Sequence, residues 1–122
     1  MSPKRVTPYE LERRDSGEPR ELVVAVAGEL DLTNAREFEE RLERLTSANG
    51  ASLVLDLSRV LFIDSAALHV LFRRARQLGR ERFGLVFDPT SPLARTFSIV
   101  AISEVATVGT SVDGLLAAPA LD

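Results

Sequence analysis

The sequence predicts a single α/β domain with a mostly parallel sheet, and two observations lead to that class. Short apolar runs typical of buried strands alternate from Leu22 onward with amphipathic helical patterns, and right-handed crossovers between such strands produce a parallel sheet. The length of 122 residues suits one domain over 1–122, whose core we expect over residues 6–117 between flexible tails.

The first half of the chain contains two expected strands and one expected helix. A weak strand near Val6–Glu12 leads into a hairpin turn, and the apolar run Leu22–Ala27 predicts a central strand that Gly28 ends. Apolar residues at helical spacing predict a helix over Thr33–Ala48. The expected caps are Thr33 or Asn34 at its start and Asn49-Gly50 at its end.

The second half continues the alternation. The run Leu53–Leu57 predicts another buried strand, and the short apolar segment Leu61–Ile63 leads into a helix over Ser65–Leu78 that Gly79 ends. The remaining elements are a strand over Phe83–Phe87, a helix opened by Ser91-Pro92, a short strand over Val105–Val108 and a helical stretch over Ser111–Ala118.

The composition narrows the function classes. A net charge of −3 lacks the basic footprint of a nucleic-acid binder, and no apolar run approaches the ~20 residues that cross a membrane. With no cysteine and one histidine, the chain offers no disulfide, no redox thiol and no metal-ligand spacing. Glycine-rich phosphate loops and a nucleophile elbow are also missing. We therefore expect a cytoplasmic protein that is not an enzyme and needs no cofactor or metal.

The first candidate site is the loop Gly28–Asp31. Glu29 and Asp31 are expected where a buried strand ends, at an edge of the sheet where α/β proteins often bind ligands. The alternative is that Gly28 only relaxes the strand end while both carboxylates face water or precede a helix cap. The residues alone leave both interpretations open.

The second candidate site is Asp64-Ser65, where an apolar segment stops and a helix starts. Ser65 suits the N-cap position, in which its hydroxyl accepts a backbone N–H. A helix N-terminus is also a favourable place for a phosphate, because its free N–H groups and dipole attract an anion. Structural capping and phosphorylation therefore both remain possible for Ser65 from the residues alone.

Three segments of the chain resemble the STAS domain family. AGELDLTNA, LVLDLSRVLFIDSAAL and SPLARTF occur in the expected order and at the expected spacing, and the resemblance spans about Val6–Ala117. Bacterial members of this family include the anti-sigma factor antagonists of sporulation and stress control. The resemblance implies the STAS fold, a mixed and mostly parallel sheet of about four to five strands with helices packed mainly on one face.

The resemblance also implies a switch. In the family, the serine directly after the aspartate at the start of the second helix is phosphorylated by an anti-sigma factor with serine kinase activity. The unphosphorylated antagonist sequesters the anti-sigma factor, and the phosphorylated form releases it. The matching position is Ser65, the phospho-acceptor, and the acidic loop residue of the family matches Asp31. The partner-binding residues expected here are Asp31, Asp64, Ser65, Ala66, His69 and Arg73.

The expected partners follow from this assignment. They are an anti-sigma factor kinase and a phosphoserine phosphatase, with the protein itself a monomer or weak dimer and without nucleic-acid or membrane binding. The alternative is a STAS adaptor subunit of a membrane lipid or anion transporter complex, in which the same fold docks on a nucleotide-binding subunit.

Two segments depart from the family pattern. Ala66 and Ala67 stand where members usually carry serine or threonine and then glycine, so Ala67 is expected to add a methyl group where a partner backbone needs room. The segment Ser98–Ile102 replaces a small turn that more often contains glycine. Both features indicate a divergent member.

The expected second helix also carries His69 and a group of arginines. His69 is expected to be exposed or to face the partner. Arg73, Arg76 and Arg80 recur at spacings of three and four, with Arg74 displaced from them. Such a face is usually only solvated, and the alternative is a stripe that meets an acidic surface on the kinase.

Overall fold

The computed structural model describes residues 6–17, 21–46 and 52–117. The expected tails, the Asn49-Gly50 helix end and Ala118 lie outside these described residues. Within the described residues, two 3-10 turns, Arg80–Arg82 and Ile102–Glu104, accompany five strands and four α-helices. In chain order these are β1 (Tyr9–Arg14), β2 (Glu21–Leu30), α1 (Ala35–Thr46), β3 (Ser52–Ile63), α2 (Ser65–Leu78), β4 (Phe83–Val86), α3 (Pro92–Ile99), β5 (Thr107–Gly109) and α4 (Val112–Ala117).

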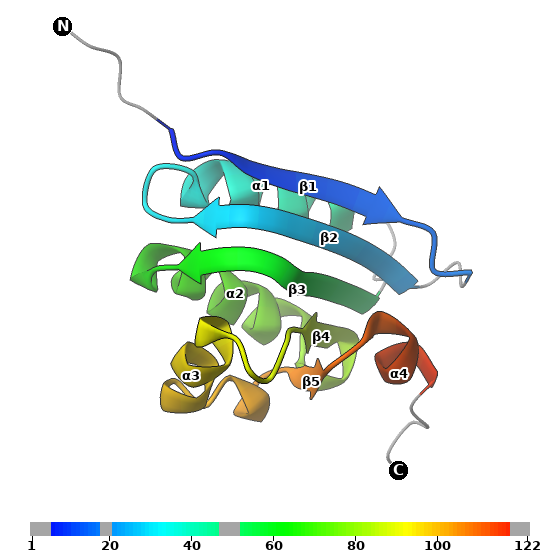
Figure 1. Cartoon of the computed structure of the whole chain (residues 1–122). Coiled ribbons are helices and arrows are strands. Elements are labelled where there is room, and N and C mark those ends of the chain that lie inside the picture. Colours follow the sequence, from blue (N-terminus) through cyan, green and yellow to red (C-terminus); the bar gives the residue numbers. More distant parts are fainter. Residues whose placement is uncertain (1–5, 18–20, 47–51, 118–122) are drawn as a thin grey trace, which may run out of the picture.

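The five strands form one mixed sheet in the order β1-β2-β3-β4-β5. β1 pairs with β2 in an antiparallel hairpin, and β2 with β3 is parallel (Figure 1). The pairs β3 with β4 and β4 with β5 are also parallel. Parallel pairs require crossovers, which α1, α2 and α3 supply. The predicted α/β class with a mostly parallel sheet is therefore confirmed.

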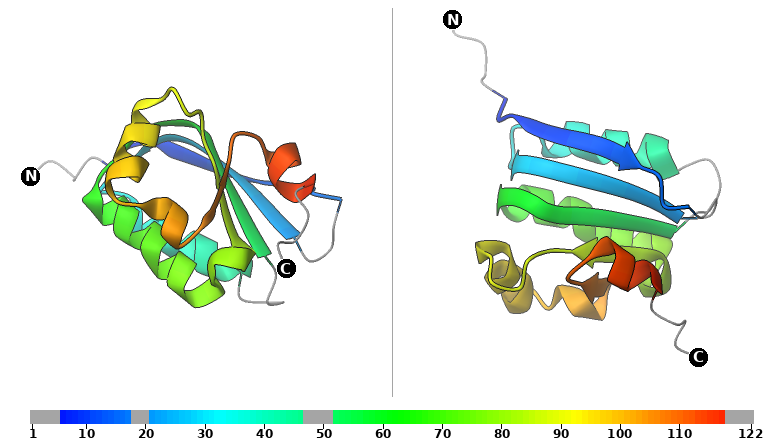
Figure 2. Two further views of the ribbon diagram at one scale, coloured as in Figure 1. Left: turned by 90° about the horizontal axis from the view of Figure 1, so that it is seen from below. Right: turned by 45° about the vertical axis from the view of Figure 1, so that its right-hand side comes forward.

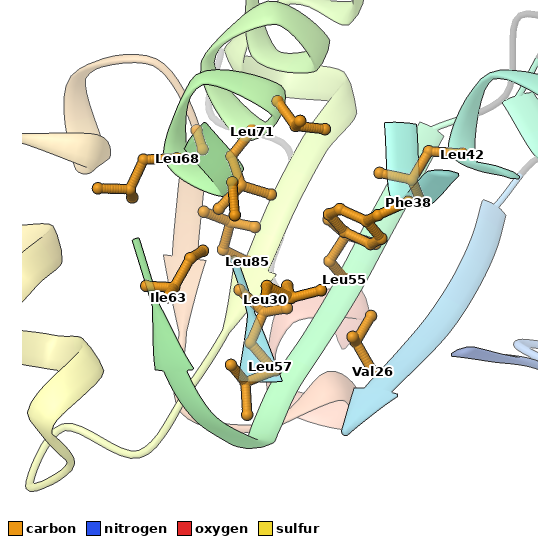
Figure 3. Close-up of a cluster of buried hydrophobic side chains, with 14 of the residues drawn as sticks. Val26, Leu30, Phe38, Leu42, Leu55, Leu57, Ile63, Leu68, Leu71 and Leu85 are labelled. Carbon is orange, nitrogen blue, oxygen red and sulfur yellow. The ribbon is translucent and has the colours of Figure 1, made fainter. Parts of the chain in front are cut away.

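The main core lies between the sheet and α1, α2 and α3. Alternate residues of β2 and β3 point to this face, where Val26 and Leu55 pack with Phe38 of α1 and Leu71 of α2 in one buried cluster (Figure 3). α3 adds two buried residues to the same cluster. Helices therefore cover mainly one face, as expected.

α4 is the exception, because it packs on the opposite face of the sheet (Figure 2). Val23, Val54 and Val86, which point away from the main core, form a small second cluster with its apolar side chains. Gly84 makes room for this packing, since a Cβ there would collide with Cδ2 of Leu115. A separate apolar contact thus holds the last helix.

Several expected strand bounds were wrong, and the differences that matter for the candidate site concern the long strands β2 and β3. β3 runs unbroken through Leu61–Ile63, because β2 continues to pair with it after an irregular register. Gly28 lies inside β2 and does not end it. Its φ is +97°, and a Cβ there would lie 2.8 Å from the carbonyl oxygen of Pro8, so glycine permits a close approach of backbone to backbone.

Candidate functional site

The candidate site lies where β2 and β3 end at the same edge of the sheet. Leu30 and Ile63 are paired in register, so the loop after β2 and the start of α2 are neighbours (Figure 1). The backbone N–H of Asp64 donates a hydrogen bond of 3.1 Å to the carbonyl oxygen of Leu30. The structure therefore brings together two segments that are far apart in the sequence.

Asp64 caps α2 and ties it to the neighbouring loop. Its Oδ1 accepts a hydrogen bond of 3.1 Å from the N–H of Ala67, and its Oδ2 accepts one of 2.9 Å from the N–H of Leu32. The expectation that Ser65 is the N-cap was wrong, because the preceding carboxylate occupies that role. Ser65 is instead the first residue of the helix.

The Ser65 side chain is exposed. Within the described part of the chain, its hydroxyl makes no hydrogen bond, since the helix cap is supplied by Asp64. The side chain stands at the positive end of a helix of 14 residues, where backbone N–H groups and the dipole favour an anion. The geometry is therefore compatible with a hydroxyl that accepts a phosphoryl group.

Asp31 is held by hydroxyl groups. Its carboxylate accepts hydrogen bonds from Oγ1 of Thr7 at 2.5 Å, from Oγ1 of Thr33 at 2.6 Å and from the Thr33 N–H at 2.9 Å. The Thr33 hydroxyl, followed by that of Thr7, holds the pKa of Asp31 below its usual value. The carboxylate is thus ionised and fixed in place. Glu29, expected in the same loop, belongs to β2.

Asn34 organises this loop, and its role was missed in the sequence. Its side chain is almost wholly buried, and Nδ2 donates to the carbonyl oxygens of Thr7 and Glu29 at 2.8 Å each. Its Oδ1 accepts from the N–H of Asp31 at 3.0 Å. A buried amide needs such partners, but the sequence carries no signal for a contact with Thr7. The local sequence suggested only one role for Asn34, as a cap at the start of the helix that follows it.

The two alanines after Ser65 differ in exposure. Ala66 is partly buried and packs against the main core, whereas Ala67 is wholly buried in it. The expectation that the methyl group of Ala67 obstructs a partner was therefore wrong, because this group points into the protein. Only Ala66 remains near the surface.

The arginines expected on one face of the second helix do not form one free stripe. Arg73 of α2 makes a bidentate ion pair with Glu39 of α1, at 2.6 and 3.0 Å. Arg80 lies beyond α2, in the 3-10 turn Arg80–Arg82, and donates to the carbonyl oxygen of Ser103. Arg74 is buried and pairs with Glu43. His69 is exposed, as expected, and partner contacts of His69 and Arg73 stay predictions.

Large apolar side chains are exposed at the same edge. Leu32, in the loop after β2, is 78% exposed, while Leu61 and Phe62 near the end of β3 are 74% and 49% exposed. The sequence placed Leu61 and Phe62 in an apolar segment, but periodicity could not tell that they face solvent. Exposed apolar clusters of this kind mark interaction surfaces.

Metal sites and membrane spans are two other features that the described residues could provide. No group of three or more histidine, aspartate or glutamate residues there could hold a metal ion. Among the helices of the same residues, none has the length and apolar character that a membrane span requires.

Comparison with known proteins identifies relatives of the chain. The STAS domain family matches residues 11–115. The anti-sigma-B factor antagonist of Listeria monocytogenes is 31% identical over 97 residues, which cover 79% of this chain and 82% of that protein. The anti-sigma-F factor antagonist RsfB of Mycobacterium tuberculosis is 35% identical over 65 residues, 52% of this chain. That match spans about half the length of RsfB, 53%.

Solved structures agree with this relationship. An anti-sigma factor antagonist from Mycobacterium paratuberculosis superimposes with a TM-score of 0.75 at 26% identity, over 89% of this chain and 92% of that one. The unphosphorylated anti-sigma factor antagonist SpoIIAA shares the fold, with a TM-score of 0.67 at 14% identity over 87% of this chain and 93% of its own. From its mixed sheet, its motifs and the match over most of its length, the chain belongs to the STAS domain family.

Proposed function

We propose that this protein is an anti-sigma factor antagonist whose binding is switched by phosphorylation of Ser65. The observation that carries the proposal is the exposed Ser65 hydroxyl, which makes no hydrogen bond in the described residues and opens α2 beside exposed apolar side chains. The names of the relatives in Listeria and Mycobacterium support the antagonist role.

The unmodified surface suits docking of another protein. Leu32, Leu61 and Phe62 offer apolar area, and removal of such area from water contributes about 25 cal/mol per Å² before the entropic cost of association is subtracted. Each oxygen of the Asp64 carboxylate already accepts one backbone N–H, which reduces the cost of removing this group from water. A neutral serine hydroxyl adds little to the desolvation penalty.

Phosphorylation changes this balance. The γ-phosphoryl group of ATP passes to Oγ of Ser65, ADP leaves, and the hydroxyl proton goes to a base on the kinase, so this protein is substrate and not catalyst. The phosphate adds about −1.5 to −2 charges next to the Asp64 carboxylate. Burying that charge in an interface is costly, and the complex dissociates. A phosphoserine phosphatase restores the binding form.

A phosphorylation assay tests the acceptor. The protein is incubated with its anti-sigma factor kinase and ATP, and mass spectrometry locates the phosphate. We expect a single phosphate on Ser65 and none on the Ser65→Ala variant, which keeps its circular dichroism spectrum. Label retained by Ser65→Ala on Ser58 or Thr33 would reject the assignment.

A binding assay tests the switch and the class of partner. Ser65→Asp is expected to weaken the complex with the anti-sigma factor at least about tenfold, because the added charge enters the interface. Ser103→Asp, an exposed serine away from this edge, is the matched control and should bind as the wild type does. Equal dissociation constants for Ser65→Asp and the wild type would contradict the switch. Specific binding to a transporter subunit, with none to an anti-sigma factor, would favour the adaptor function.

A further inference from the structure

We propose that a groove between the end of β3 and the start of α3 receives an apolar side chain and a neighbouring carboxylate of the anti-sigma factor. This inference rests on the proposed function and specifies its partner. The hollow, here called the β3–α3 groove, has a volume of about 520 Å³. Its lining includes Leu61, Phe62, Pro92, Leu93, Arg95 and Thr96.

The walls of the β3–α3 groove are apolar. Leu61 and Phe62 rise from β3 on one side, with large exposed fractions, and Pro92 and Leu93 of α3 line the other side. Leu93 also belongs to the main core, so this wall is rigidly attached to the fold. A concave apolar site with fixed walls is the kind of pocket in which one anchoring side chain of a partner contributes much of the binding energy.

The positive charge in the lining of the groove favours an acidic group on the partner. Arg95 is the charged residue of the lining, and it is exposed. Within the described residues its guanidinium has no ion pair or hydrogen bond, in contrast to Arg73, which is paired with Glu39. A cation next to an apolar hollow is complementary to a segment with an apolar side chain and a nearby aspartate or glutamate.

The same charge argues against a second copy of this chain as the occupant. A two-fold symmetric contact through the groove would place two Arg95 side chains in one interface, and the lining contains no acidic residue to offset them. The groove is also continuous along the chain with the switch, because Phe62 precedes Ser65 by three residues. One partner can therefore cover both.

The experiment measures the dissociation constant for the purified anti-sigma factor kinase that modifies Ser65. We expect Leu61→Ser and Phe62→Ser each to weaken binding about tenfold or more, through loss of the apolar contact. Arg95→Glu should weaken it similarly and flatten its dependence on salt. Ile99→Ser is the matched control, because Ile99 is an exposed apolar residue of α3 that does not line the groove, and its effect should stay within twofold.

The outcomes separate this inference from the proposed function. If Ser65→Asp releases the kinase while the Leu61, Phe62 and Arg95 variants bind like the wild type, the groove proposal is overturned and the switch stands. A kinase that does not bind at all overturns both. A dimer of the free protein, detected by light scattering and abolished by Phe62→Ser, would make a second copy the occupant and also overturn the groove proposal. Circular dichroism of each variant checks that the exposed substitutions leave the fold intact.

Discussion

At the scale of single residues, one contact of an aspartate recurs three times, after the ends of β2 and β4 and within β3. In each case a carboxylate oxygen accepts both the backbone N–H and the hydroxyl of the serine or threonine two residues later, which is the geometry of a local turn. Asp31 at the candidate site belongs to this group, so part of the hydrogen bonding around it recurs elsewhere in the fold and is not specific to the site. The three pairs are Asp31 with Thr33, Asp56 with Ser58 and Asp88 with Thr90.

The hydroxyl of Thr33 is the main cause of the lowered pKa of Asp31, and its removal is expected to raise that pKa toward 3.8. A group whose pKa is lowered by folding stabilises the protein above its unfolded value, and this contribution is lost as pH falls through the folded pKa. Thr33→Val should therefore lower the free energy of unfolding at pH values above the unfolded pKa, and the part of this free energy that the wild type loses on acidification should become smaller. Carbon-13 NMR titration of the Asp31 carboxyl group measures the shift.

Thr90→Val provides the control for this titration. It removes the corresponding hydroxyl from Asp88, whose pKa is also lowered by its contacts with Thr90, and should leave the Asp31 titration unchanged. An Asp31 midpoint that is the same in the wild type and Thr33→Val would show that other groups keep this carboxylate ionised.

The sequence located the two segments that meet at the candidate site but could not assign the roles of all their residues. Asp64 and Ser65 are both favourable N-caps, so local propensity could not choose between them. The contact that distinguishes them runs from Asp64 to the N–H of Leu32, in a loop that only the folded sheet brings near. The partners of buried Asn34 depend on the same tertiary arrangement.

At the scale of elements, local patterns predicted helices better than strand ends. The bounds of α2, Ser65–Leu78, agree with the expected helix because an apolar stripe and Gly79 at its end mark it locally. The ends of β2 and β3 depend instead on pairing between these two strands, which continues past Gly28 and to Ile63. The order of the residues in the sequence does not show which residues of β2 and β3 pair with one another.

The packing of α4 on the second face depends on Gly84, and Gly84→Ala is expected to destabilise the protein by about 1 kcal/mol. The new methyl group would collide with the Leu115 side chain, which must move. Urea unfolding measures the change in the free energy of unfolding. The expected effect is a weaker attachment of α4, with the main core retained.

A double-mutant cycle isolates this contact. Leu115→Ala removes the colliding atoms, so Gly84→Ala should cost markedly less in that background than in the wild type. If both backgrounds lose the same free energy, the alanine must disturb something other than Leu115, for example Val54, whose Cγ2 would lie 3.5 Å from the new Cβ.

At the scale of the whole molecule, the core and the candidate site are separated. Buried side chains lie between the sheet and its helices, whereas Ser65 and the exposed apolar residues lie at one edge. A charge added to this edge therefore meets no core residue, and it lies at a helix start where an anion is favourable. The fold can therefore accommodate Ser65 both without and with a phosphate.

We accordingly expect Ser65→Asp to change the free energy of unfolding by no more than about 0.5 kcal/mol, even though it weakens partner binding. Thermal or urea unfolding of the isolated variant gives this value. Asp64→Ala is the contrasting variant, since loss of an N-cap costs about 1 kcal/mol. Marked unfolding of Ser65→Asp would mean that the charge acts through the fold and not through the interface.

The fastening of Thr7 has a practical consequence for the study of this protein. Thr7 is held to Asp31, Thr33 and Asn34 by three hydrogen bonds, so the chain enters β1 from the rim that holds Ser65. α4 leaves the sheet far from that rim (Figure 1). A fluorophore, purification handle or surface tether joined ahead of Val6 would begin beside the docking region and obstruct it, whereas attachment after α4 leaves the approach open.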